Sequence, residues 1–134
     1  MGQNRSRSPN VLLVEDQVMI ALATASCLAE RGFEVTCAAN AHEALLHLRS
    51  AARIDALFTD IDLGGPVDGS MVAAIARELR PGLAVLYTSG RSTLEEFRAV
   101  SGSEFIPKPY DLDRVSSLLR QLMAMRDARV PHVA

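Results

Sequence analysis

The chain alternates short apolar runs with helical patterns, and this alternation constrains the fold more than any other feature. The runs "NVLLV" (10–14), "DALFT" (55–59) and "LAVLYT" (83–88) are almost continuously apolar, as is typical of parallel strands buried on both faces. "FEVTCAA" (33–39) and the short "EFI" (104–106) complete five strands. Parallel strands need crossover connections, which are usually helices. The sequence therefore predicts an α/β fold with one parallel sheet and helices on both faces.

Helical patterns fill the connections between these strands. In the first helix, four apolar side chains recur with helical spacing and should face the sheet: Val18, Leu22, Ala25 and Leu28. Asn40 should cap the second helix. The expected helices are residues 17–31, 41–50, 68–80, about 91–100 and 111–126. The helical signal over 91–100 is thin, so we expect that helix to be short.

Length and charge narrow the range of partners. With 134 residues the chain can form one domain, which we assign to 10–126, with tails at 1–9 and 127–134. A net charge of −2 leaves no basic stripe, so nucleic acid is not an expected partner. No apolar stretch approaches the roughly 18 to 20 residues that span a bilayer, and no signal peptide is recognisable. We therefore expect a cytoplasmic protein without membrane contact.

Polar residues follow the strands and should meet at one edge of the sheet. The first strand ends at Glu15 and Asp16, the third at Asp60 and the fourth at Thr88, while Lys108 follows the fifth. In open α/β sheets, ligands bind beyond these carboxyl ends. Each residue also has an ordinary explanation: Asp16 could cap a helix, Thr88 could be a turn residue, and Lys108 could be a solvated loop lysine.

Three carboxylates at one edge call for a cation. Like charges about 4 Å apart repel by roughly 4 kcal/mol at an effective dielectric of 20. Carboxylate oxygens with room for water suit Mg²⁺, and Lys108 adds a second positive group. Together they would offset the charge of a phosphoryl group transferred to Asp60, which is the candidate nucleophile. The hydroxyl of Thr88 could then bind a phosphoryl oxygen, making a charge-dependent switch.

The motifs "VLLVED", "LFTD", "VLYTS" and "FIPKPY", in this order, resemble the receiver domain of two-component response regulators. The resemblance covers about 10–126. It implies a flavodoxin-like, doubly wound five-stranded parallel sheet with strand order 2-1-3-4-5, built from five βα units. It also implies a signalling protein that catalyses its own phosphorylation and dephosphorylation and is not otherwise an enzyme.

The resemblance assigns a role to each site residue. It implies that Asp60 accepts a phosphoryl group from a sensor histidine kinase. Mg²⁺ would be held by Asp16, Asp60 and the backbone carbonyl of Asp62, with Glu15 helping directly or through water. The remaining roles implied are pairing of Lys108 with Asp60, phosphoryl binding by Thr88, a cis peptide between Lys108 and Pro109, and an aromatic switch at Phe105.

Some features depart from the common family pattern. Glu15 replaces the more usual aspartate, and the loop "IDLGGP" after Asp60 has about one extra residue before Gly69. The span from Thr88 to Phe105 is about two residues short. "DIDLGGPVDG", "TSGR" and "FIPKPYD" are similar to single-domain receivers paired with HWE-type histidine kinases. With no output domain after 126, we expect a stand-alone regulator that acts through an unknown downstream protein or as a phosphate shuttle or sink.

Three other readings fit part of the sequence. A Toprim-like nucleotidyl-transfer domain would use Glu15, Asp60 and Asp62 as metal ligands, but it explains neither Thr88 nor the Lys108–Pro109 pair. A haloacid-dehalogenase-type phosphatase also uses a DxD motif, but on its first strand. A degenerate receiver that binds partners without phosphorylation is the third, and the retained Asp60, Thr88 and Lys108 argue against it.

Overall fold

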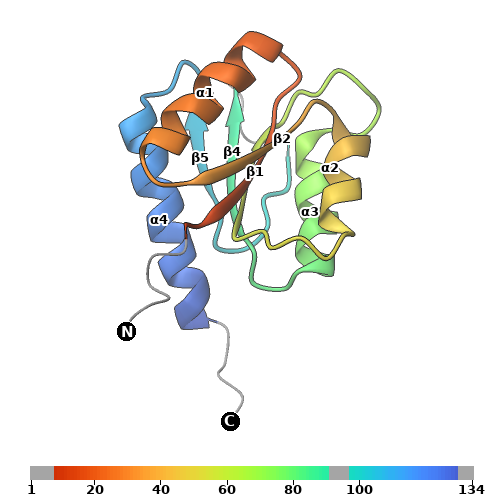
Figure 1. The fold of residues 1–134 in the computed structure, drawn as a ribbon. Helices are drawn as coiled ribbons and strands as arrows, with labels where there is room; N and C mark the ends of the chain where they lie inside the picture. Colours follow the sequence, from red (N-terminus) through yellow and green to blue (C-terminus); the bar gives the residue numbers. More distant parts are fainter. Residues whose placement is uncertain (1–7, 91–96, 130–134) are drawn as a thin grey trace.

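The computed structural model describes residues 8–90 and 97–129, which form five strands and four helices (Figure 1). In chain order these are β1 (Asn10–Val14), α1 (Val18–Glu30), β2 (Glu34–Ala38), α2 (Ala41–Leu48), β3 (Ala56–Asp60), α3 (Gly69–Leu79), β4 (Ala84–Ser89), β5 (Glu104–Pro107) and α4 (Leu112–Arg129). None of the described helices is both long and apolar enough to cross a membrane.

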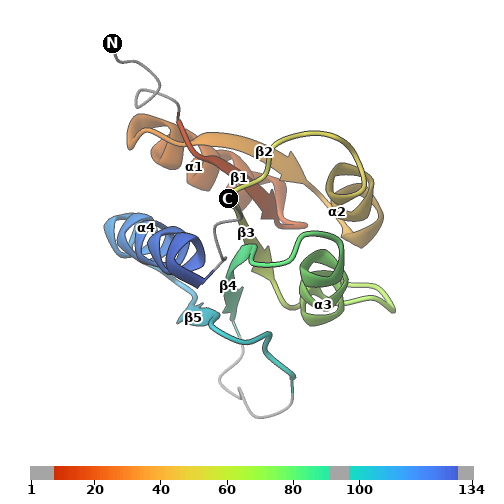
Figure 2. The same cartoon turned by 90° about the horizontal axis from the view of Figure 1, so that it is seen from below.

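All five strands are parallel and lie in the order β2-β1-β3-β4-β5. Helices α1 and α4 cover one face of the sheet, and α2 and α3 cover the other (Figure 2). Strand β2 lies on one side of β1 and strand β3 on the other, so the strand order reverses at β1 and β3. In open α/β sheets the ligand-binding crevice lies at the carboxyl ends of the strands at such a point. The predicted fold class and strand order are confirmed.

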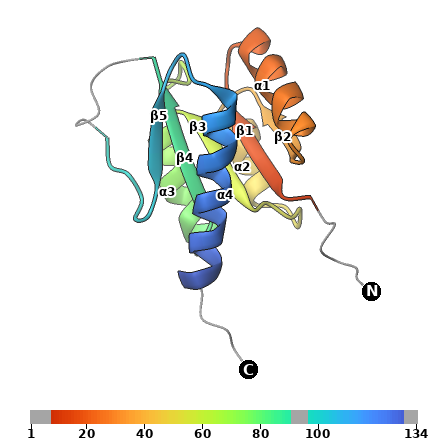
Figure 3. The same ribbon diagram turned by 90° about the vertical axis from the view of Figure 1, so that its left-hand side faces the viewer.

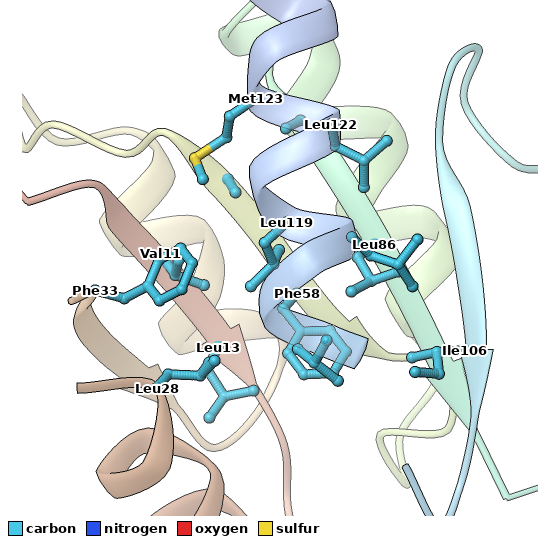
Figure 4. Packing of buried hydrophobic residues seen from close by; sticks show 14 of the residues in the cluster. Val11, Leu13, Leu28, Phe33, Phe58, Leu86, Ile106, Leu119, Leu122 and Met123 are labelled. Atoms are coloured by element: carbon cyan, nitrogen blue, oxygen red, sulfur yellow. The ribbon is translucent and has the colours of Figure 1, made fainter. Parts of the chain in front are cut away.

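The two faces of the sheet form two separate cores, which explains why the sequences of the central strands β1, β3 and β4 are almost continuously apolar. Successive side chains of a strand point to opposite faces. Leu13 and Phe58 pack beneath α1 and α4 (Figure 4), whereas Leu12 and Leu57 pack beneath α2 and α3. Leu119 of α4 is completely buried in the first of these cores.

Helix α1 turns a different side to the sheet from the one predicted. Val18 and Leu22 are 65% and 60% exposed, whereas Ala21, Thr24 and Leu28 are buried. The small and medium side chains at 21 and 24 let the helix approach the sheet closely, and the bulkier residues beside them face outward. The predictions for Leu28, which is buried, and Ala25, which packs against the same core, are confirmed, and the prediction for Val18 and Leu22 is wrong.

The connection between β4 and β5 also departs from the expected pattern. The first part of the predicted 91–100 helix, residues 91–96, lies outside the described residues, and 97–100 are not helical. Instead, the buried Tyr87 hydroxyl accepts a hydrogen bond from the Val100 backbone N–H at 3.0 Å.

Helix α4 lies across the sheet, and its last turns extend past the strand ends (Figure 3). The helix ends at Arg129, three residues beyond the predicted end at 126.

Candidate functional site

Strands β1 and β3 deliver the acidic residues of the site because they are neighbours in the sheet. Val14 and Thr59 are register partners, so the residues that follow them, Glu15 and Asp60, come to the same edge. Both are buried, with 2% and 4% exposure, whereas Asp16 is exposed. Carboxylate oxygens of Glu15, Asp16 and Asp60 all lie within 4.8 Å of one another. The structure therefore brings together the three predicted carboxylates.

Asp16 does not serve as the helix cap that would have been its ordinary role. The N-cap of α1 is Gln17, which makes no side-chain capping hydrogen bond. By contrast, Asn40 caps α2 as predicted, accepting from the Glu43 backbone N–H at 2.9 Å. The Asp16 carboxylate thus belongs to the acidic cluster, and its position needs an explanation other than helix capping.

Lys108 inserts its ammonium group between two of the carboxylates. Its Nζ donates to Asp60 Oδ2 at 3.0 Å and lies 2.8 Å from Glu15 Oε1. The buried Oε1 of Glu15 is therefore engaged with the ammonium group of Lys108. The Lys108 side chain is 15% exposed, which excludes a freely solvated loop lysine. The Lys108–Pro109 peptide bond that follows is cis.

Burial and charge act in opposite directions on these groups. Burial raises the pKa of Asp60 above its ordinary value, while Lys108 acts to lower it. Burial also acts to lower the pKa of Lys108, but the hydrogen bonds and charges of Glu15 and Asp60 outweigh it and raise that pKa. Lys108 is therefore a cation at neutral pH, and it shares the site with three carboxyl groups. Hard oxygen ligands with an excess of negative charge fit Mg²⁺.

Thr88 lies in strand β4 and is not a turn residue. It is the register partner of Asp60, so both side chains project from the same face of the sheet. Its Oγ1 is buried and has no hydrogen-bond partner among the residues that the structure describes. Buried hydroxyls are normally paired, and an unmade bond costs about 1–3 kcal/mol.

Asp62 bridges the site in a way that the sequence did not reveal. Its backbone N–H donates to Asp60 Oδ1 at 3.1 Å, and its Oδ2 accepts from Ser89 Oγ at 3.2 Å. The family resemblance implies a role only for the main-chain carbonyl of Asp62. The hydroxyl that holds its carboxylate lies 27 residues away, at the end of β4, where no local pattern could signal it.

Gly69 fixes the end of β3 and was missed as a site residue. Its N–H donates to the Ile61 carbonyl at 2.8 Å at the start of α3. A Cβ atom placed on Gly69 would lie 2.0 Å from the Asp60 backbone oxygen, so only glycine lets the helix approach this closely. The signal was available as a glycine directly after Asp68, which caps α3 through the Met71 N–H.

Phe105 lies on β5, half-buried, at the margin of the site. It is the register partner of Tyr87, and its ring centroid is 6.5 Å from that of Phe97. Phe97 in turn meets the Tyr87 ring edge-on at 4.8 Å. The residue predicted as the aromatic switch therefore belongs to a group of three rings, one of which directly precedes Thr88.

The sequence model of the response regulator receiver domain matches residues 11–120, most of the described fold. This chain belongs to that family. The receiver fold also appears in the crystal structure of a response regulator receiver protein from Sinorhizobium medicae, with a TM-score of 0.85 and 33% identity over 90% of this chain and 98% of that one. The receiver domain of the hybrid histidine kinase CckA has a TM-score of 0.72 and 31% identity, covering 85% of this chain and 98% of that one.

Among curated proteins, the putative NtrX-like response regulator of Rickettsia felis is 31% identical over 116 residues, 84% of this chain. The receiver spans about a quarter of that relative's length, since the match covers 24% of it. Membership of the receiver family rules out the Toprim-like and haloacid-dehalogenase-type readings. Receiver domains belong to two-component systems, interact with histidine kinases and bind Mg²⁺ at an acidic pocket.

Proposed function

We propose that Asp60 is a phosphoacceptor and that this receiver carries a signal as an aspartyl phosphate. The observation that supports this most is the arrangement around one carboxylate: Lys108 Nζ lies 3.0 Å from Asp60 Oδ2, within a cluster of acidic groups that needs a further cation. A purely structural ion pair would need the lysine but not the extra carboxylates.

In the reaction, an Asp60 carboxylate oxygen forms a bond to phosphorus while the bond from phosphorus to the donor's histidine nitrogen breaks. The donor keeps the electron pair of that bond. Lys108 offsets negative charge on the reacting oxygens, and the unpaired hydroxyl of Thr88 donates to a phosphoryl oxygen. Lys108 already contacts Asp60 before the reaction, so it needs little reorganisation.

The metal ligands that we propose are the carboxylates of Asp16 and Asp60 and the main-chain carbonyl of Asp62, with Glu15 directly or through water. Mg²⁺ held there would supply positive charge to the phosphoryl oxygens during transfer and hydrolysis. Glu15 contacts Lys108 through Oε1 and accepts from the Gln17 N–H through Oε2 at 3.1 Å. One carboxylate oxygen of Glu15 therefore contacts Lys108, while the residue also belongs to the acidic cluster with Asp16 and Asp60.

The surface beside Asp60 favours a protein as the phosphoryl donor. Val18, Met19 and Leu22 are large apolar side chains exposed at the start of α1, just beyond the acidic pair. Met19 also lines an apolar hollow of about 480 Å³, together with Tyr110, between α1 and the segment after β5. We propose that a sensor histidine kinase of the HWE type docks on this surface, and that the exchange occurs in the cytoplasm.

For the output, we propose that the phosphoryl group is read through Thr88 and Phe105. Phosphorylation of Asp60 changes its single carboxylate charge to about −1.5 to −2 and adds three acceptor oxygens beside the Thr88 hydroxyl. A shift of Thr88 toward them would move β4 against the ring group that contains Phe105. The altered surface would engage a downstream protein, or the phosphoryl group itself would pass on.

Phosphotransfer from autophosphorylated HWE-type kinases tests the donor. We expect the wild type to be labelled, Asp60→Asn to be unlabelled, and Leu22→Ser to be labelled about tenfold more slowly because a docking residue is lost. The matched control is Leu46→Ser, which alters a leucine of α2 that is 57% exposed and should transfer at the wild-type rate. Acetyl phosphate, which needs no docking, should label both serine variants equally. Equal kinase rates for Leu22→Ser and Leu46→Ser would contradict docking on α1.

A further inference from the structure

A second charged hollow lies at the opposite edge of the sheet from Asp60. Asp55 immediately precedes β3, whereas Asp60 ends it, so the strand separates the two sites. The hollow measures about 320 Å³ and is lined by Arg53, Arg120 and Arg126, by Asp55, and by Met123 and Ala124 of α4. Among the described residues that line this hollow, three guanidinium groups share the space with one carboxylate.

Two of these arginines are fixed by the buried carboxylate. The Asp55 side chain is 7% exposed, and Arg53 Nε lies 3.2 Å from each of its oxygens. Arg126 lies 3.5 Å from Asp55 Oδ1 and donates to the Asp55 backbone carbonyl at 3.1 Å. The carboxylate also accepts from the Asn10 N–H at 2.7 Å, which anchors it to β1.

Arg120 is held by different contacts. Its guanidinium carbon lies 4.4 Å from the centre of the Phe33 ring, and one terminal nitrogen donates to the Arg31 carbonyl at 2.7 Å. Stacking on a ring and bonding to a carbonyl orient a guanidinium without neutralising its charge. The group is therefore ordered in the free protein, which lowers the entropic cost of binding an anion.

We propose that this hollow binds a phosphoryl-bearing small anion. Planar guanidinium forks match phosphate oxygens in paired hydrogen bonds, and three arginines line the hollow with a single carboxylate. The volume of about 320 Å³ lies at the lower end of the range of small-molecule sites, and Met123 and Ala124 offer an apolar wall to the organic part. The site is independent of phosphotransfer at Asp60.

Titration of ¹⁵N-labelled protein with inorganic phosphate tests the site. The Asp60→Asn variant without Mg²⁺ would be used at constant ionic strength, so that the acidic site does not contribute. We expect saturable shifts of the backbone amides of Arg53, Asp55 and Arg126. Arg120→Gln should weaken binding at least tenfold, whereas the matched control Arg98→Gln, at an exposed arginine between β4 and β5, should bind as the parent does.

Two further arms separate the alternatives. Arg120→Lys keeps the charge but loses the planar fork, so it should bind several-fold more weakly; this variant also serves if Arg120→Gln fails to fold. Acetate at equal concentration should produce no saturable shift. The proposal would be overturned if the shifts rose linearly with phosphate concentration, or if Arg98→Gln lost as much phosphate affinity as Arg120→Gln. Unchanged phosphate binding in both Arg120 variants, or acetate binding as tight as phosphate binding, would also overturn it.

Discussion

At Asp60, burial favours the neutral carboxyl group, whereas the phosphoryl transfer that we propose requires the charged carboxylate. The carboxylate lies at the buried end of β3, with Glu15 nearby and a single ammonium group between them. A protein selected for stability alone would have no reason to keep both acids here, because each buried charge weakens the folded state. The cost is understandable if the site holds a cation and a reacting phosphoryl group.

The raised pKa of Asp60 predicts how stability should depend on pH. Because the pKa is higher in the folded than in the unfolded state, the folded protein binds more protons, and stability falls as pH rises through the window between the two values. Without Mg²⁺, we expect Asp60→Asn to be more stable than the wild type above this window and to lack that part of the pH dependence. Urea unfolding from pH 4 to 8 measures both; parallel curves for the two proteins would contradict the prediction.

Gly69 should be the least replaceable glycine of the site. A Cβ atom there would meet the Asp60 backbone at 2.0 Å, so Gly69→Ala must push α3 away from the end of β3. We expect a loss of about 2–3 kcal/mol in unfolding free energy, together with impaired phosphorylation.

The matched control for this substitution is Gly65→Ala in the same loop. A Cβ atom on Gly65 would meet no atom within 4 Å, so the change in stability should stay within about 0.5 kcal/mol. Chemical denaturation of both variants measures their free energies of unfolding. Equal losses of stability in Gly69→Ala and Gly65→Ala would contradict the prediction that the close approach at Gly69 makes its replacement costly.

Among the elements, β1, β3 and β4 were predictable because burial on both faces leaves a continuous apolar run, and this signal is local. The exposed side of α1 was not predictable, since Val18 and Leu22 have the spacing of core residues and only the sheet decides which side is covered. The contacts of Asp62 with Ser89 and of Tyr87 with Val100 join segments distant in sequence, so they too required the structure.

The bond from the Val100 N–H to the Tyr87 hydroxyl should hold the β4–β5 connection to the sheet. Tyr87→Phe removes the acceptor and leaves the half-buried N–H unpaired, at a cost of about 1–3 kcal/mol. Hydrogen exchange at the Val100 amide should accelerate about tenfold or more. Tyr110→Phe, which removes a hydroxyl bonded to Thr24 at 2.8 Å instead, should leave Val100 exchange unchanged. Equal acceleration in both variants would refute the local tether.

On the scale of the whole molecule, the sheet separates two sites of opposite charge. Its carboxyl edge gathers Glu15, Asp16 and Asp60, and its other edge gathers arginines around Asp55. The acidic edge could be predicted because parallel strands must end together, which made residues far apart in sequence neighbours in space. The basic edge combines a loop residue with two arginines of α4, and no strand pattern pointed to it.

The most direct test of the account is to locate the modified residue after incubation with acetyl phosphate and Mg²⁺. Reduction with borohydride converts an aspartyl phosphate to homoserine, which peptide mass spectrometry assigns to a position. We predict homoserine at position 60 in the wild type and in Asp62→Asn, with none in Asp60→Asn or when Mg²⁺ is chelated. Modification at Glu15 or Asp16, or no modification with either acetyl phosphate or kinase donors, would contradict the assignment of Asp60 as the phosphoacceptor.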